Sequence, residues 1–165
     1  MNNFYIKMSP LAGMVGYGGG GTGIAIGGSV AAKIHYGDRG IASPGGSATG
    51  HTPGDRIHYY AITTTGNASD FGDPTDNKYK VGCCSDGEFG RGLFGGGNKW
   101  NNTANITNEI EYITISTTGN GTDFGDLDRA AMELSAAGDP GVGKGFFTGG
   151  YTSGGSRDGQ IDAVT

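Results

Sequence analysis

Aromatic and amide side chains follow two glycine pairs in this sequence, in places where they could bind a sugar. Trp100 is followed by Asn101 and Asn102, and Tyr151 comes directly after the second glycine pair. Aromatic rings stack on sugars and amides bond their hydroxyls, usually from loops on a rigid sheet. One aromatic residue per loop is weak evidence, so packing over a sheet edge is the favoured interpretation, and a ligand-contact loop formed by these four residues is the alternative.

Oxygen-bearing side chains recur at three-residue spacing in two places. They are Asn67, Asp70 and Asp73, and then Asn120, Asp123 and Asp126. Calcium would need about six or more oxygens from a bent loop. The neighbouring glycines instead indicate turns, in which Asn and Asp bond to the nearby backbone. We therefore expect turn capping, and no metal or cofactor.

The nucleophiles and titratable groups form no recognisable catalytic motif. The three histidines, His35, His51 and His58, are scattered along the chain. His58 is matched by Glu111 in the repeat described below, which predicts an exposed and tolerant position. Cys83 and Cys84 are adjacent and match alanines, which predicts small buried apolar residues. We expect a protein that is not an enzyme.

An internal repeat must position all of these residues. Ile57–Asp73 and Ile110–Asp126 are identical at 11 of 17 positions, at a shift of 53 residues without gaps. Arg91–Gly97 matches Lys144–Gly150 at the same shift, and Arg39–Ile41 lines up with the start of both segments, which marks the N-terminal third as a degenerate copy. A unit of this size cannot bury its own faces alone. We divide the chain into repeats at 1–56, 57–109 and 110–165.

The repeat also predicts the strands. Apolar residues lie on both faces of Ile57–Thr65 and Ile110–Ser116, as in strands with neighbours on both sides. Short strands are expected through Phe71 and Phe124. Further strands are expected at Lys80–Cys84, Glu133–Ala137, Gly92–Gly95 and Gly145–Thr148.

The segment Leu127–Ala137 favours a helix by propensity. Its duplicate, Pro74–Cys84, has no helical character, so we expect a loop and a strand in both. Ile161–Thr165 matches the start of a long strand, whose open edge Phe4–Met8 or a neighbouring chain could complete.

Composition narrows the class of protein. Glycine supplies 36 of 165 residues without a three-residue period, which excludes collagen and favours short strands joined by tight turns. The net charge of −5 argues against a nucleic-acid partner. No apolar run approaches the roughly 20 residues of a membrane span, and Met1–Ala12 lacks the apolar core of a signal peptide.

A basic residue precedes a glycine at the start of one strand in each repeat. These residues are Arg39, Arg91 and Lys144. We expect each to pair with a nearby aspartate, with a contact between subunits as the alternative.

The glycine pairs and the aromatic turn resemble the kelch repeat, in which a glycine pair follows the second strand of a four-stranded blade and a Trp lies near its last strand. Phe71 and Phe124 occupy the place of that Trp, and Trp100 lies in the loop instead. The signature residues are Arg91, Gly96, Gly97, Lys144, Gly149, Gly150, Phe71 and Phe124. The patterns TTGN-x-[ST]-DFGD and RG-φ-F-GGG are similar to those of kelch-like repeat proteins of tailed bacteriophages, over residues 40–165.

This resemblance implies an all-β fold of kelch-like β-propeller blades with four antiparallel strands each, in about three repeats, which oligomerisation could complete. It implies a structural or adhesive virion component, such as a tail fibre, that presents variable loops to a host surface or a neighbouring subunit. The expected partners are copies of the chain, other virion proteins and host surface glycans. The alternative is an extracellular carbohydrate-binding propeller lectin outside any virion.

Overall fold

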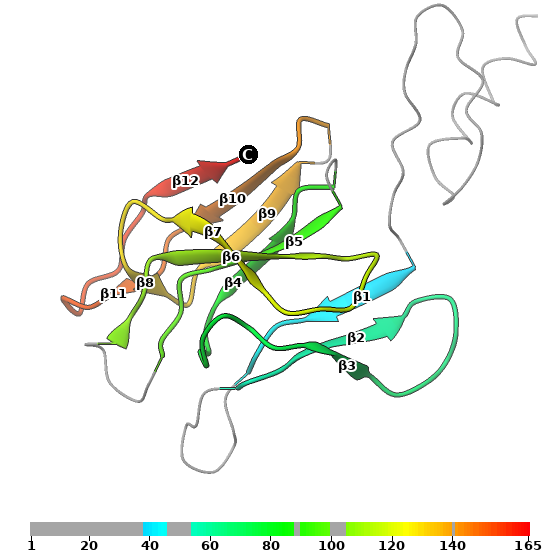
Figure 1. Ribbon diagram of the computed structural model, residues 1–165. Helices are drawn as coiled ribbons and strands as arrows, with labels where there is room; N and C mark the ends of the chain where they lie inside the picture. Colours follow the sequence, from blue (N-terminus) through cyan, green and yellow to red (C-terminus); the bar gives the residue numbers. More distant parts are fainter. Residues whose placement is uncertain (1–37, 46–53, 88–89, 100–104, 140) are drawn as a thin grey trace, which may run out of the picture.

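The computed structural model describes residues 38–45, 54–87, 90–99, 105–139 and 141–165 (Figure 1). Its strands are β1 (Arg39–Ala42), β2 (Ile57–Ala61), β3 (Ser69–Gly72), β4 (Gly82–Ser85), β5 (Arg91–Gly95), β6 (Glu109–Thr114), β7 (Thr122–Asp126), β8 (Ala131–Met132), β9 (Ser135–Asp139), β10 (Lys144–Thr148), β11 (Tyr151–Thr152) and β12 (Ile161–Val164). Within these residues, no helix has the length and apolar character needed to cross a membrane.

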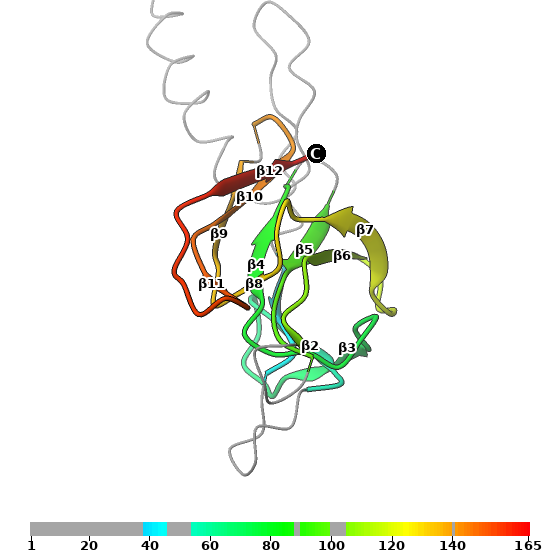
Figure 2. The same ribbon diagram turned by 90° about the vertical axis from the view of Figure 1, so that its left-hand side faces the viewer.

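The strands form antiparallel sheets, which confirms the expected all-β class. The central sheet has the order β4-β5-β6-β7, so each strand pairs with the next one along the chain. A second sheet has the order β1-β2-β3 and a third the order β12-β10-β9, while β8 and β11 form a short ribbon. Figures 1 and 2 show the second and third sheets on opposite sides of the central one.

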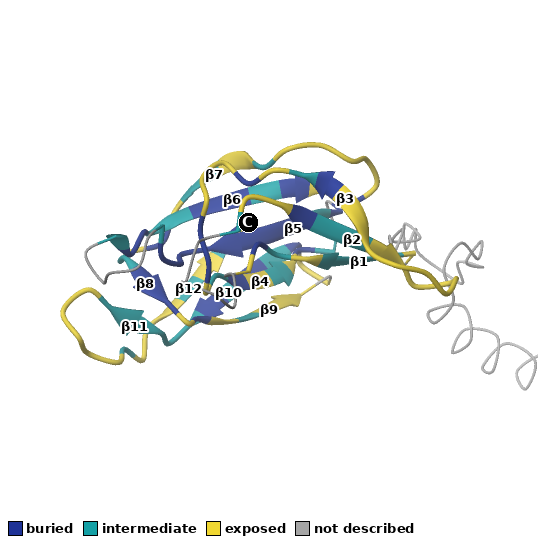
Figure 3. Cartoon of the chain, turned by 90° about the horizontal axis from the view of Figure 1, so that it is seen from below, coloured by how far each residue is buried: buried dark blue, intermediate teal, exposed yellow. Residues whose placement is uncertain are grey.

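The central sheet is buried on both faces. Leu93, Ile110 and Phe147 belong to a core shared with the β12-β10-β9 sheet. Phe94 and Ile113 belong to a second core, shared with the β1-β2-β3 sheet. Figure 3 shows β5 buried along almost its whole length. The prediction that β6 has neighbours on both sides is therefore confirmed.

The sequence repeat is also a structural repeat. The pairs Cys84↔Leu93 and Gly95↔Ile110 of the central sheet correspond to Ala137↔Phe146 and Thr148↔Ile161 of the third sheet. The β2–β3 and β6–β7 ladders both shift register after the first residue of the 17-residue repeat. Equivalent residues can therefore be compared directly between sheets.

Each glycine pair ends a strand with a backbone that other residues rarely adopt. Gly96 and Gly97 have φ of 65° and 104°, and Gly149 and Gly150 have φ of 68° and 109°. A Cβ atom on Gly96 would lie 2.3 Å from the carbonyl oxygen of Ala131. Glycine is needed here because the turn is left-handed and the next repeat passes close to it.

Several element boundaries differ from the predicted ones. No helix forms over 127–137, as expected, but β4 and β9 each begin two residues later than predicted. The reason is that Lys80 and Glu133 have φ of 60° and 59°, which a strand cannot contain. The strands β2 and β6 end at Ala61 and Thr114, before their polar turns. Residues 4–8 lie outside the described residues.

The sheets do not coincide with the repeats drawn at 57–109 and 110–165. The central sheet takes β4 and β5 from the first of these segments and β6 and β7 from the second. Consecutive repeats are therefore joined through a shared sheet.

Candidate functional site

The segments that follow the glycine pairs, at one end of the sheets, form the candidate site. Trp100, Asn101 and Asn102 lie outside the described residues. Tyr151 is half-buried in β11, where it pairs with Met132 of β8. The structure thus describes the frame of the predicted ligand-contact region and one of its four residues.

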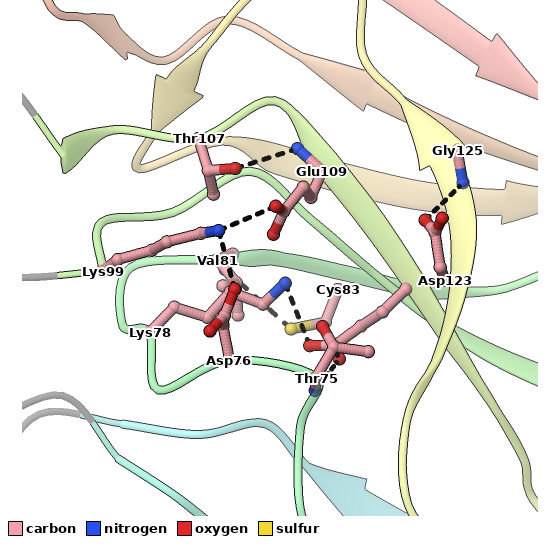
Figure 4. A network of polar contacts seen from close by, with 11 residues as sticks. Thr75, Asp76, Lys78, Val81, Cys83, Lys99, Thr107, Glu109, Asp123 and Gly125 are labelled. Carbon is pink, nitrogen blue, oxygen red and sulfur yellow. Dashed lines mark hydrogen bonds and ion pairs between the residues drawn. The ribbon is translucent and has the colours of Figure 1, made fainter.

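The chain on either side of 100–104 is firmly held. The Lys99 amide donates to the Asn105 carbonyl oxygen at 3.0 Å, and the Thr107 amide donates to the Gly97 carbonyl oxygen at 3.0 Å. The Lys99 ammonium group lies 2.7 Å from a carboxylate oxygen of Asp76 and 2.7 Å from one of Glu109 (Figure 4). One lysine therefore joins the segment before β4, the segment after β5 and the start of β6.

The pKa of Lys99 reflects this arrangement. Burial lowers the pKa, but the hydrogen bonds to the Asp76 and Glu109 carboxylates outweigh it and raise the pKa above its ordinary 10.5. Lys99 therefore remains charged and bound to both carboxylates at neutral pH. This favours a role in holding the loop over one as a catalytic base.

At the third sheet an ion pair also holds the corresponding segment, but a basic residue occupies the place of the acidic one. Arg129 matches Asp76 at the shift of 53 residues. Its guanidinium group pairs with Asp158 at 2.6 Å, and it donates to Gln160 at 2.6 Å and to the Gly149 carbonyl oxygen at 3.0 Å. Each loop is therefore held by an ion pair to the equivalent residue beside its own sheet. That residue is acidic beside one sheet and basic beside the other, and the two loops differ in length and sequence.

A buried ion pair lies beneath this frame. The Lys78 ammonium group is 3.1 Å from Oε1 of Glu111, and their side chains are 0% and 1% exposed. The amide and the hydroxyl of Thr75 donate to Oε2 of Glu111 at 2.6 Å and 2.9 Å. Figure 4 shows Thr75 and Lys78 together in this network. The prediction that the position shared by His58 and Glu111 is exposed is therefore wrong for Glu111, while His58 is half-buried.

The sequence contained a signal for this pair. Glu111 stands between Ile110 and Tyr112 in a strand whose two faces are both apolar. A charged residue there requires a partner, because an unpaired buried carboxylate is very costly. The identity of the partner could not be predicted, since Lys78 lies outside the strands, in an isolated β-bridge 33 residues earlier.

The predicted aspartate pairing of the strand-initial arginine is confirmed for Arg91. Its Nε lies 2.5 Å from Oδ2 of the buried Asp86, and its amide donates to Oδ1 at 3.1 Å. The guanidinium group also stacks over Phe124 at 4.9 Å, and Phe124 meets Tyr112 edge to face at 6.1 Å.

A similar cluster occurs in the preceding repeat, where Arg39 lies 4.9 Å from the ring of Tyr59, the counterpart of Tyr112, and Tyr59 meets Phe71 at 6.0 Å. Arg39 donates to the carbonyl oxygen of Ile115 at 3.0 Å rather than to an aspartate. The signature residues Phe71 and Phe124 therefore pack and stabilise the outer strands. Lys144, the third basic residue, lies half-buried at the start of β10.

Among the repeated Asn and Asp residues, turn capping is seen for Asp123, while Asn120 makes a contact between repeats. Asp123 accepts from the Gly125 amide at 3.1 Å, and Asn120 accepts from the Asp73 amide of the other repeat at 3.1 Å. The Gly121 amide donates to the Asp73 carbonyl oxygen at 2.8 Å. Asn120 thus links two sheets rather than capping its own turn. No group of three or more His, Cys, Asp or Glu residues that could hold a metal occurs among the described residues.

The prediction that both cysteines are buried is wrong for Cys83. Both are free thiols; Cys83 is exposed and Cys84 is half-buried against the core. Burial raises the pKa of Cys84 to about 11. The neutral thiol therefore dominates near pH 7, which disfavours a nucleophilic role.

Equivalent residues of neighbouring repeats also contact each other. The ammonium group of Lys80 lies 2.7 Å from Oε1 of Glu133, and the Glu133 amide donates to the Lys80 carbonyl oxygen at 2.9 Å. These residues are separated by one repeat length and share a left-handed backbone. Two repeats therefore meet through the same position in each.

The packed sheets form a frame, and ion pairs and hydrogen bonds fix the segments at its loop end. A comparison with protein-family models finds no match, and a comparison with curated proteins finds no significant match.

Proposed function

We propose that this protein is a structural or adhesive component of a phage virion, such as a tail fibre, built of kelch-like blades. Its role would be to hold loops of variable sequence in a fixed position against a host surface or a neighbouring virion subunit. The proposal combines the repeat patterns with the geometry of the loop end. It involves no chemical step.

The observation that carries the proposal is the pair of equivalent loop anchors. Lys99 binds Asp76 and Glu109 in one repeat, and Arg129 binds Asp158 in the next. The anchor is present in both, whereas its polarity and the loop it holds differ. Such a design suits a display frame, in which loops vary while their attachment points stay fixed.

Several blades in one particle would strengthen binding. Repeated weak contacts give avidity when the sites are held at a fixed spacing. The buried faces of the central sheet supply the stiffness needed, because both cores join it to neighbouring sheets.

Mass spectrometry of purified phage particles tests the virion role directly. We expect the protein in particles that remain after density-gradient purification and washing in high salt. Its absence from such particles, while it accumulates in the infected cell, would contradict the proposal.

Glycan binding at the loop end requires a separate test. We expect purified protein to bind a subset of a glycan array, and Trp100→Ala to abolish that binding without lowering the melting temperature. Tyr151→Ala is a less clean variant because Tyr151 is half-buried in β11. An adhesive role through sugars would be refuted if Trp100→Ala and the unmodified protein bound the array equally.

A further inference from the structure

We propose that copies of this chain associate head to tail, through the outer faces of the β1-β2-β3 and β12-β10-β9 sheets. The first surface, called the Tyr60 face, consists of Gly40, Ala42, His58 and Tyr60. The second surface, called the Phe146 face, consists of Ala137, Phe146, Thr148, Ile161 and Ala163. The inference goes beyond the proposed function, because it depends on the packing of the repeats and not on where the protein works.

The two surfaces are recognised by comparison with the central sheet. Tyr60 is 48% exposed, whereas its equivalent Ile113 is 2% exposed. Ile161 is 69% exposed, whereas its equivalent Ile110 is 1% exposed. The central sheet is covered at both positions by a neighbouring sheet. The two outer sheets therefore expose faces whose equivalents on the central sheet are covered by neighbouring sheets.

A second position on the Tyr60 side shows the same contrast. Ile113 and Ile115 both lie next to Gly92, on the face that the β1-β2-β3 sheet covers. Their counterparts are Tyr60 and Ile62. Ile62 is 59% exposed and Ile115 only 9%. Adjacent exposed apolar side chains on a sheet are typical of an interaction surface rather than of scattered surface residues.

The two faces also have compensating sizes. Inside the chain, Phe147 packs on Gly95, where a Cβ atom would come within 2.8 Å of its ring. On the Phe146 face, the residue equivalent to Gly95 is Thr148. Its side chain leaves no room for a phenylalanine. On the Tyr60 face, the residue equivalent to Phe147 is the smaller Ala42. The larger residue on one face is thus matched by a smaller one on the other, as expected if they pack together.

The occupant that fits is a second copy of the chain. The two contacts between sheets are heterologous, because in each a Leu93-type face meets a Phe147-type face. Within the described part of the chain, the Tyr60 face is the exposed surface of the Phe147 type, and the Phe146 face is the exposed surface of the Leu93 type. Heterologous contacts close into a ring or extend as a filament. With the two-stranded β8–β11 ribbon left aside, the described residues of two copies would bring six sheets together, within the roughly four to eight sheets of closed propellers.

Sedimentation of the full chain and of two single variants tests this association. We expect the unmodified protein to sediment at twice the 16.7 kDa of one chain. Tyr60→Arg and Ile161→Arg should each raise the dissociation constant by about thirtyfold or more and give monomers, because a charge is placed in a desolvated contact. Both side chains are exposed in the single chain, so both variants should fold, which circular dichroism and thermal melting will check.

Mixing the two variants gives the decisive measurement. Tyr60→Arg keeps an intact Phe146 face and Ile161→Arg keeps an intact Tyr60 face. The mixture should therefore form a heterodimer through one intact contact, although neither variant associates alone. Val142→Arg serves as the matched control. Val142 is an apolar residue that is 55% exposed, in the turn between β9 and β10, and its replacement should leave the sedimentation unchanged.

Three results would overturn the proposal. The first is a monomeric unmodified protein; if Tyr60→Arg then also lowered the melting temperature, residues 1–37 of the same chain would be the occupant. The second is a variant that still dimerises alone, which would indicate a like-to-like contact. The third is a mixture that stays monomeric.

Discussion

Removal of Lys78 should destabilise this protein far more than removal of any exposed lysine. Lys78 is the buried partner of Glu111, with 3.1 Å between the charged atoms. At an effective dielectric constant of about 20, this distance corresponds to an attraction of roughly 5 kcal/mol. The desolvation of both groups offsets much of that attraction, so the pair itself contributes little net stability.

The variant Lys78→Met removes the attraction but leaves the Glu111 carboxylate buried. Breaking a buried pair in this way costs about 3–5 kcal/mol. For a chain of this length, that loss lowers the melting temperature by roughly 10 °C. Urea unfolding followed by circular dichroism should report the loss as a lower midpoint with an unchanged slope.

A double variant separates the charge from the packing. In Lys78→Met/Glu111→Gln the buried charge is gone, while the amide oxygen can still accept the two hydrogen bonds from Thr75. We expect the double variant to lose about 2 kcal/mol less than the sum of the two single variants.

Lys80→Met is the matched control, because it removes the same group from an exposed pair. Its partner is Glu133, and the two side chains are 38% and 45% exposed. We expect a loss of about 1 kcal/mol or less. If Lys78→Met cost no more than Lys80→Met, the argument from burial would be refuted.

Three further predictions follow from single groups. Gly96→Ala should cost about 2 kcal/mol, because φ is 65° and a Cβ atom would strike a backbone oxygen, whereas Gly66→Ala should be nearly neutral since nothing lies within 4 Å of a Cβ there. The hydrogen bond from Lys80 lowers the pKa of Glu133 below its ordinary 4.5, so its small stabilising contribution is present above pH 4.5 and is lost as the pH falls through the lower pKa of the folded state. Glu133→Gln should therefore flatten the acid side of the stability profile measured by thermal melting. Alkylation of Cys84 at pH 8, followed by mass spectrometry, should be roughly one hundredfold slower than that of an ordinary thiol, because its pKa is raised to about 11.

Each of these predictions has a contrary outcome. Equal melting temperatures for Gly96→Ala and Gly66→Ala would show that the left-handed turn is not needed. An unchanged acid profile in Glu133→Gln would mean that the pair has no linkage to folding. Alkylation of Cys84 at the rate of a small-molecule thiol would show that the thiol is open to water.

The comparison of the two repeats gave the most reliable sequence predictions. It correctly excluded a helix over 127–137, because the duplicate segment lacks helical character. It also placed the glycine pairs at strand ends, where positive φ requires glycine. These predictions succeeded because the backbone preference of a residue depends mainly on its neighbours in the sequence, and two copies of each segment could be compared.

The same comparison failed for Glu111. Matching Glu111 to His58 suggested a tolerant surface position, since the two residues differ. In the structure Glu111 is buried, because the segment that supplies Thr75 and Lys78 packs against it, whereas His58 is half-buried. Equivalent positions in two repeats share a backbone conformation, but different residues can pack around them.

The sequence by itself determined the strands, the turns and their repetition, because each depends on side-chain alternation and on backbone angles within a few residues. The tertiary structure alone decided which faces are covered and which charges meet. Lys78 reaches Glu111, and Lys99 reaches Asp76, only because antiparallel strands fold distant segments together. Burial then sets what each contact is worth, because an ion pair removed from water cannot lose one partner without a large cost.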